Sequence, residues 1–252
     1  MNPTPYQFAQ TVEEASLNAW PALQTMLLDG WLLRFANGYS RRNNSVNALF
    51  AGREPLPEKF VRCEAIFRRQ GQPPTFRMTP FSQPDDLDAA LAARGYAKIS
   101  PTSVQGAPLA QLPPPNPAIA VRRQFAPDDP WVAAYSQMNL VRAGKEETLR
   151  QILDHIPVAG CYASIEQNGE MVACGLGVLQ EQFVGLFDIV THPAQRGRGL
   201  GKAIVLDLLH WAAENGAAHA YLQVVADNAP ALRLYAGLGF TELYQYWYRV
   251  ED

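Results

Sequence analysis

The 252-residue sequence predicts an α/β fold with a mixed sheet, and three observations lead to this prediction. Strand and helix patterns alternate along the second half, a proline-rich stretch divides the chain, and the first half repeats part of the second. Hydrophobic residues make up 48% of the chain and charged residues 18%, as in ordinary globular proteins. We therefore expect two well-cored domains rather than a disordered chain.

The proline-rich stretch PTSVQGAPLAQLPPPNPAI occupies residues 101–119. Proline cannot donate a hydrogen bond to a sheet and restricts φ, so this stretch predicts an extended connector. We therefore place a first domain at 1–100, a linker at 101–118 and a second domain at 119–252. A single domain that carries an unrelated N-terminal cap is the alternative.

Each element of the second half is predicted from its own pattern. Helical spacing of apolar residues, with prolines and acids at one start and Gly216 as a stop, predicts helices at 127–141, 146–156, 199–216 and 231–239. Alternating or continuous apolar runs predict strands at 119–125, 161–167, 170–180, 183–193, 220–225 and 240–250. The dipeptide Asn168-Gly169 between two of these strands is typical of a tight hairpin.

The end of the first half repeats the end of the second. Residues 74–99 follow the order strand, turn, helix, Gly-aromatic, strand. When Gly95-Tyr96 is set against Gly239-Phe240, the helices LDAALAARGY and ALRLYAGLGF align. Such a repeat favours two copies of one fold.

Composition excludes several classes of function. A net charge of −3 disfavours binding to nucleic acid through bulk electrostatics, and no apolar run is long enough to span a membrane. The start MNPTPYQFAQ lacks the pattern of a secretory signal. Cys63, Cys161 and Cys174 lie too far apart for a metal site and are expected to be buried, non-reactive thiols in a cytoplasmic protein. We expect a monomer or homodimer without a metal.

The stretch FDIVTHPAQRGRGLGK at 187–202 has the strongest chemical signal. It passes from a buried strand through a loop rich in Gly and Arg directly into a helix. The unpaired N–H groups at a helix start attract anions, and glycines let an anion approach the main chain. The stretch predicts a diphosphate cradle; a purely structural turn is the alternative. The glycines and cations concerned are Arg196, Gly197, Arg198, Gly199, Gly201 and Lys202.

Two familiar phosphate motifs do not fit this loop. The dinucleotide fingerprint G-x-G-x-x-G does not match Gly197, Gly199 and Gly201. The P-loop motif fails as well, since Ala203 follows Lys202 where Ser or Thr is required.

The loop matches R-x-x-G-x-G from Arg196 to Gly201, with Asn228 and Tyr235-x-x-x-Gly239-Phe240 further on. This combination resembles motif A and the following segments of the GNAT superfamily, the acyl-CoA-dependent N-acyltransferases. The stretch 187–240 is similar to the ribosomal-protein N-terminal acetyltransferases. The resemblance implies two GNAT-like domains, each a mixed, mostly antiparallel sheet flanked by helices. The first domain is expected to be degenerate, since Leu91 aligns with Tyr235.

The resemblance also implies acetyl-CoA as the cofactor and assigns roles to residues. The main chain of Ile189, Val190 and Thr191 is expected to bind the pantetheine arm. Asn228 is expected to contact the pantetheine or the acceptor; capping of the next helix is its alternative role, and both can hold. The diphosphate is expected to bind at Arg196, Gly197, Arg198, Gly199, Leu200, Gly201 and Lys202.

Acyl transfer to an amine requires a proton donor for the departing thiolate and benefits from a base. Tyr235 stands at the position of the family's general acid; a packed aromatic residue is the alternative. The related enzymes carry glutamate where this chain has Gln223, which cannot accept a proton. Asp188 is therefore the candidate base, with a structural role at the strand end as its alternative. Glu181 and His192 are weaker candidates.

A second unusual stretch, NGYSRRNNS, follows the predicted strand GWLLRF. From Arg34 to Arg77 the chain has nine Lys or Arg against three Glu. Either this is a solvated face, or Arg41, Arg42 and Asn43 (or Asn44) bind the carboxylate of an acceptor.

We therefore predict an N-acetyltransferase that acts on a primary amine of a small molecule, such as an amino acid or derivative. A peptide N-terminal acetyltransferase and a CoA-binding regulatory module without turnover are the alternatives.

Overall fold

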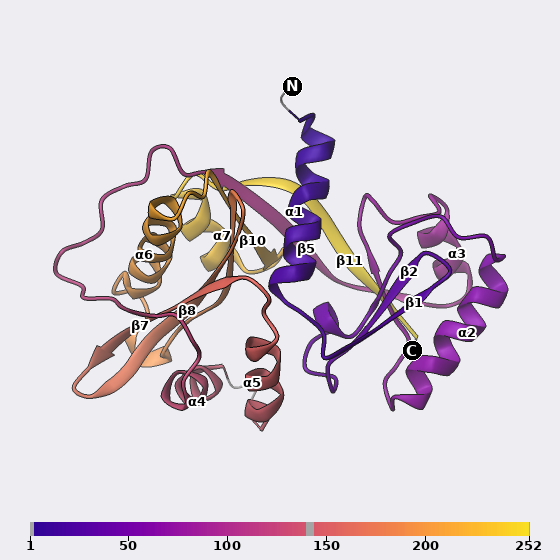
Figure 1. Ribbon diagram of the computed structural model, residues 1–252, viewed down its shortest axis with the longest axis horizontal. Coiled ribbons are helices and arrows are strands. Elements are labelled where there is room, and N and C mark those ends of the chain that lie inside the picture. Colours follow the sequence, from indigo (N-terminus) through magenta and orange to yellow (C-terminus); the bar gives the residue numbers. More distant parts are fainter. Residues whose placement is uncertain (1–2, 140–143, 252) are drawn as a thin grey trace. The chain divides into compact units, whose positions relative to one another are not determined.

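The computed structural model describes residues 3–139 and 144–251, which form two compact units (Figure 1). The first unit comprises Met1–Trp20, Val104–Val224 and Asn228–Leu243. The second comprises Pro21–Ser103, Val225–Asp227 and Tyr244–Asp252. Strands β5 (Ala97–Pro108) and β11 (Thr241–Val250) contribute residues to both units.

The other helices and strands of the first unit come mostly from the second half of the sequence. They are α1 (Pro5–Ala19), β6 (Arg122–Gln124), α4 (Asp129–Met138), α5 (Glu146–Asp154), β7 (Ala159–Gln167), β8 (Glu170–Gln180), β9 (Phe183–Thr191), η3 (Pro193–Gln195), α6 (Leu200–Glu214), β10 (His219–Val225) and α7 (Ala229–Ala236).

The sheet of the first unit has the strand order β5-β10-β9-β8-β7-β6. Strands β6 to β9 pair antiparallel, while β9 and β10 pair parallel, so the sheet is mixed and mostly antiparallel. The long hairpin of β7 and β8 turns at Asn168 and Gly169, both of which have positive φ (53° and 79°), as a type I′ turn requires (Figure 1). The sequence prediction of this hairpin is confirmed.

Helices cover both faces of this sheet. Helix α6 packs its apolar side on one face, where Ile204 and Leu208 lie beside Gly175 of β8. On the other face, Trp20 at the end of α1 stacks on Phe187 of β9, and Trp131 of α4 donates a hydrogen bond to Ala163 O of β7.

The second unit has its own sheet and core. Its sheet runs β1-β2-β3-β4-β11, with β3 and β4 parallel and the other pairs antiparallel. Buried Trp31, Phe60, Phe67 and Phe76 form the centre of its core. Its further elements are β1 (Gln24–Leu28), β2 (Trp31–Phe35), η1 (Arg41–Asn43), β3 (Val46–Asn47), α2 (Leu56–Arg69), β4 (Thr75–Met78) and α3 (Leu87–Ala93).

The structure corrects the predicted linker. Residues 101–108 belong to β5, and only the following residues up to 118 lack regular structure. Pro101 and Pro108 stand at the two ends of a proline-free run of six residues, which can pair as a strand. The compact units also divide the chain differently from the predicted boundaries, since α1 belongs to the first unit and the end of β11 to the second.

Most predicted elements of the second half are confirmed, with shorter ends. The predicted strand at 119–125 is reduced to Arg122–Gln124. The predicted helix at 127–141 is observed as Asp129–Met138, and its last two positions lie outside the described residues. All three cysteines are buried and free, as expected. In the part of the chain that the structure describes, none of the helices is long and apolar enough to cross a bilayer.

Asp88 of α3 connects this helix to β11 within the second unit. Its carboxylate accepts hydrogen bonds from Trp247 Nε1 at 2.7 Å and from Arg249 Nε and Nη2 at 2.8 and 2.9 Å. The bonds from Arg249, aided by Trp247, outweigh desolvation and lower the pKa of Asp88. The carboxylate therefore stabilises the fold above its ordinary pKa of about 4, and this contribution is lost as the pH falls through the lowered pKa.

We predict that Asp88→Asn lowers the free energy of unfolding at pH 7 by about 2 kcal/mol, because a charge-assisted pair of hydrogen bonds is lost. Urea denaturation measures this difference, which should shrink as the pH falls through the lowered pKa and the wild-type carboxylate becomes protonated. Asp86→Asn is the matched control, since Asp86 is exposed and its side chain makes no capping bond to α3. Equal losses in both variants would contradict the assignment.

Candidate active site

The loop between β9 and α6 has the geometry of an anion cradle. Gly197 and Gly199 both have a φ of +79°, a conformation that glycine adopts without strain. A Cβ at either position would meet no atom of the described residues within 4 Å, so the space beside the main chain is open. A ligand can therefore reach the backbone here.

The helix start supplies hydrogen-bond donors to this space. Gly199 is the N-cap of α6, and Ala203 N donates to Gly199 O at 3.0 Å as the first helical bond. The N–H groups that precede this bond, at Leu200, Gly201 and Lys202, have no acceptor within the helix. Arg196 and Arg198 are exposed on the same loop, and Lys202 is exposed in the first turn of α6; all three add positive charge. The arrangement suits a diphosphate.

Beside the loop, the two parallel strands of the sheet stop pairing. The ladder between β9 and β10 joins Phe183–Leu186 to His219–Leu222 and ends there, although both strands continue. Ile189, Val190 and Thr191 lie in this continuation of β9. An extended ligand can align its amides with strand backbone at such a position, in the manner of an added strand.

A β-bulge interrupts β9 at the same place. Cys174 pairs with Val190 and Leu176 with Phe187, so Asp188 and Ile189 together oppose Gly175. Asp188 has a φ of +52°, which an L-residue adopts at a cost of about 1 kcal/mol or more. Such strain is found preferentially at functional sites.

The side chain of Asp188 belongs to a network that sequence reasoning missed. Tyr135 OH donates to Asp188 Oδ1 at 2.7 Å, and Asn139 Nδ2 donates to Tyr135 OH at 2.7 Å. Both partners come from α4 or its C-cap, about fifty residues away in the chain. No signal in the sequence joins these residues to Asp188.

Gln223 and the two weaker candidate bases, Glu181 and His192, lie at other positions. Gln223 follows directly after the last pair of the β9–β10 ladder. Glu181 is exposed in the turn between β8 and β9, at the far end of β9 from Asp188. His192 is exposed, and its Nδ1 accepts from Ala194 N at 3.3 Å as the cap of η3. The role of Asp188 as the base stays a prediction.

Tyr235 lies on α7, with 8% of its surface exposed. Desolvation raises the pKa of its phenol to about 12, so the hydroxyl stays protonated at neutral pH. Asn228 is the N-cap of α7, and its side chain accepts from Ala231 N at 3.3 Å. The capping role of Asn228 is thus confirmed, while its contact with a ligand stays a prediction.

Comparison with known proteins identifies the family. The model of the family described as "Probable histone acetyltransferase Rv0428c C-terminal" matches residues 9–249 of the chain. The chain belongs to this acetyltransferase family.

Relatives and solved structures agree with this result. The acetyltransferase is 25% identical over 243 residues to the "Uncharacterized N-acetyltransferase YobR" of Bacillus subtilis, covering 95% of this chain and 97% of that protein. A GCN5-related N-acetyltransferase from Kribbella flavida superposes with a TM-score of 0.72 at 15% identity, covering 100% and 97% of the two chains. A tandem GNAT protein from the clavulanic acid biosynthesis pathway superposes with a TM-score of 0.60 at 16% identity, covering 78% and 70%. The protein is a GNAT acetyltransferase.

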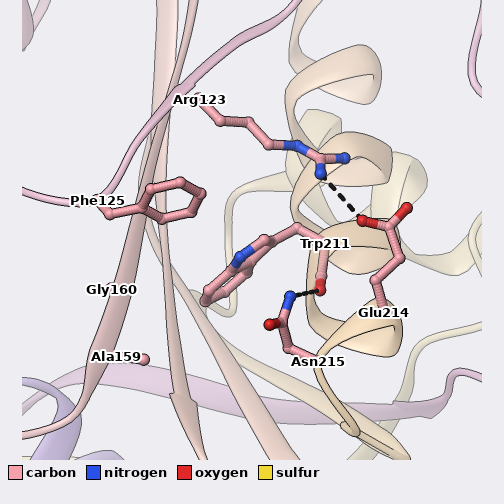
Figure 2. Close-up of a pocket in the computed structure, with 7 residues that line it drawn as sticks. All are labelled: Arg123, Phe125, Ala159, Gly160, Trp211, Glu214 and Asn215. Carbon is pink, nitrogen blue, oxygen red and sulfur yellow. Dashed lines mark hydrogen bonds and ion pairs between the residues drawn. The ribbon is translucent and has the colours of Figure 1, made fainter.

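A separate depression lies at the C-terminal end of α6 (Figure 2). It has a volume of about 470 Å³, and the rings of Phe125 and Trp211 on its walls are 6.5 Å apart. Arg123 at its rim is already paired with Asp207 and Glu214 of α6. No residue predicted for the acetyltransferase site lines this depression. Its lining residues are Arg123, Phe125, Ala159, Gly160, Trp211, Glu214 and Asn215.

The predicted acceptor residues belong to the second unit of the acetyltransferase, and the structure separates their roles. Arg41 is exposed, and Arg42 is half-buried. Asn43 is fully buried, and its Oδ1 accepts from Ser40 N and Oγ at 3.2 and 2.8 Å. The Asn43 amide is thus occupied by its bonds to Ser40, the N-cap of η1. Of the three predicted residues, only the two arginines retain a side chain suited to a ligand.

Arg42 belongs to a cluster of buried or half-buried arginines within the positive stretch 34–77. The Arg77 guanidinium lies 3.9 Å from the centre of the Tyr246 ring, and both Arg34 and Arg77 are buried. Burial opposes ionisation of Tyr246, but the guanidinium groups of Arg42 and Arg77 outweigh it and lower the pKa of this phenol. The second unit thus concentrates positive charge around Arg42.

Proposed function

We propose that this GNAT acetyltransferase moves the acetyl group of acetyl-CoA to a primary amine of a small molecule, such as an amino acid or a derivative of one. One observation carries the proposal: an open glycine loop leads into α6 next to the point where the β9–β10 ladder ends. This combination offers one site for a diphosphate and one for an extended arm, in the order in which coenzyme A presents them.

The residues present fit the donor molecule. The open space at Gly197 and Gly199 admits a diphosphate, and the N–H groups of Leu200, Gly201 and Lys202 supply its hydrogen bonds. Bound acetyl-CoA supplies a thioester whose carbonyl carbon is open to attack by an amine. The continuation of β9 from Ile189 to Thr191 is suited to align the arm that carries this group.

The proton transfers are assigned to two side chains of the first unit. Tyr235, protonated because burial raises its pKa to about 12, donates to the departing sulfur. Asp188 accepts the proton of the attacking amine, since Gln223 cannot. An α-amine of pKa near 8 is already partly neutral at physiological pH and needs only modest assistance from a base.

A carboxylate on the acceptor would account for the cluster around Arg42. We predict that Arg42→Ala raises the KM for the acceptor about tenfold or more, because a charge-assisted bond is lost. Arg41→Ala should raise it less, because Arg41 is exposed. The KM for acetyl-CoA should be unchanged in both, and steady-state kinetics measures all three constants. An unchanged acceptor KM in both variants would remove this assignment.

A second candidate acceptor is the amine of a protein. The description of the matched family, a probable histone acetyltransferase, favours it. The likeness of residues 187–240 to the ribosomal-protein N-terminal acetyltransferases favours it as well. A third possibility is a module that binds CoA without turnover, which Gln223 favours.

A thiol-release assay separates these functions. It uses acetyl-CoA with three acceptor sets: free amino acids and their amides, peptides that begin with alanine, and a lysine-rich histone peptide. Turnover with the first set supports the proposal, and turnover with only the peptides supports the second candidate. Binding of acetyl-CoA in calorimetry without any turnover supports the third.

A further inference from the structure

The bulge in β9 changes the direction in which Asp188 points. Along this strand, Val184 and Leu186 lie in the core under α6, whereas Phe187 faces α1 on the opposite side. Regular alternation would place the next residue, Asp188, in the apolar core under α6. The bulge instead lets Ile189 take that place, beside Gly175, and leaves Asp188 on the face covered by α4.

On that face, α4 presents a prepared hydrogen-bond partner. The Tyr135 ring is buried and stacks on Trp131, with 5.6 Å between ring centres and 8° between planes. Trp131 is itself fixed by its bond to Ala163 O of β7 at 3.2 Å. The Tyr135 hydroxyl therefore has a defined position, 2.7 Å from Asp188 Oδ1.

The direction of the hydrogen bonds follows from the groups involved. The amide Nδ2 of Asn139 can only donate, so the Tyr135 oxygen accepts from it. Tyr135 has a single hydroxyl proton, and it goes to Asp188. A hydrogen bond donated to a carboxylate stabilises its ionised form. The hydrogen bonds from Asn139 to Tyr135 and from Tyr135 to Asp188 thus orient the carboxylate and favour its charged form.

We propose that Tyr135 and Asn139 are positioning residues that hold Asp188 as the ionised proton acceptor of acetyl transfer, a role that rests on the proposed function. In this step the amine nitrogen bonds to the acetyl carbon, and its proton passes to the Asp188 carboxylate. The carbon–sulfur bond breaks, and the sulfur takes the proton of Tyr235. Exchange with solvent returns both side chains to their starting states.

The neighbouring elements carry other titratable groups that bear on a pH-dependent test. Tyr162 of β7 and Cys174 of β8 lie near Asp188, and burial raises the pKa of each, so both are neutral at physiological pH. Helix α1, which also packs on β9, carries the buried Glu13, and β10 carries the buried Tyr221. The measurement must therefore resolve Asp188 itself.

Carbon-13 NMR of protein labelled at the aspartate carboxyl carbons provides this resolution, with Asp188→Asn assigning the signal. We expect Tyr135→Phe to raise the pKa of Asp188 by about one unit or more, because the bond that favours the charged form is lost. Asn139→Ala should raise it less. Tyr162→Phe is the matched control, since it removes another buried phenol hydroxyl whose ring packs against Trp131. An Asp188 titration that is the same in Tyr135→Phe and wild type would overturn the proposal.

Kinetics with the amine that serves best in the acceptor panel provides the second measurement. In Tyr135→Phe, the acidic limb of the kcat/KM profile should move to higher pH, while the rate on the alkaline plateau stays within about threefold of wild type. The Kd for acetyl-CoA should be unchanged. An unmoved limb, or the same loss in Tyr162→Phe, would overturn the positioning role. If Tyr135→Phe does not fold, the half-buried Asn139→Ala carries both measurements.

Different results would contradict the proposed function and the positioning role of Tyr135 and Asn139. A wild-type protein that transfers no acetyl group to any amine contradicts the proposed function, and the NMR titration still decides whether Tyr135 orders Asp188. Full activity of Asp188→Asn contradicts the present inference and leaves the acetyltransferase assignment intact.

Discussion

Gly199→Asp is expected to weaken acetyl-CoA binding at least 100-fold, or roughly 3 kcal/mol, while the protein remains folded. Gly199 is the N-cap of α6, a position at which aspartate is favourable because its carboxylate accepts from the first helical N–H groups. Aspartate also tolerates positive φ better than most residues. The new carboxylate would occupy the open space, accept hydrogen bonds from the N–H groups at the start of α6 and repel a diphosphate.

Isothermal titration calorimetry with acetyl-CoA measures this effect, and thermal unfolding checks the fold. Gly216→Asp is the matched control, because Gly216 also has a strongly positive φ of 93° but follows the C-terminal end of the same helix. The control should cost stability, through its unfavourable charge at the negative end of α6, and leave acetyl-CoA binding unchanged. Wild-type affinity in Gly199→Asp would show that the diphosphate does not bind at this loop.

The local features of the fold could be predicted from the sequence. The helix expected at 199–216 is observed at Leu200–Glu214, because apolar spacing and flanking glycines are signals within the segment itself. The hairpin at Asn168-Gly169 follows equally from two residues that accept positive φ. The glycine loop and its cations could be found for the same reason.

The features that could not be predicted from the sequence depend on contacts between distant segments. The bond between Tyr135 and Asp188 joins residues 53 positions apart, and no periodic pattern reveals a bulge that reverses the alternation of β9. Strand β4 of the first half pairs with β11 at the end of the chain, so a boundary inferred from composition cannot separate the units. The burial of Asn43, which removes it from the acceptor residues, is likewise a tertiary property.

Tyr235→Phe is expected to lower kcat by an order of magnitude or more, with little change in the Kd for acetyl-CoA. Phenylalanine preserves the ring, which packs 5.8 Å from Phe240 between ring centres, and removes only the hydroxyl. Because burial raises the pKa of Tyr235 to about 12, its proton is present across the whole assay range. Loss of this residue should therefore reduce the rate by a similar factor at every pH from 6 to 10, within roughly twofold.

A loss of rate that is independent of pH distinguishes the role of Tyr235 from that of Asp188. Removal of the hydrogen bond to Asp188 should move the acidic limb of the profile, whereas removal of the Tyr235 hydroxyl should lower the profile without moving it. Phe240→Leu is the packing control: it disturbs the surroundings of the Tyr235 ring but keeps the phenol, so its kcat should remain within about threefold of wild type. If Tyr235→Phe retains full kcat, the departing thiolate must take its proton from another group or from water, and Tyr235 is then a packed aromatic residue of α7.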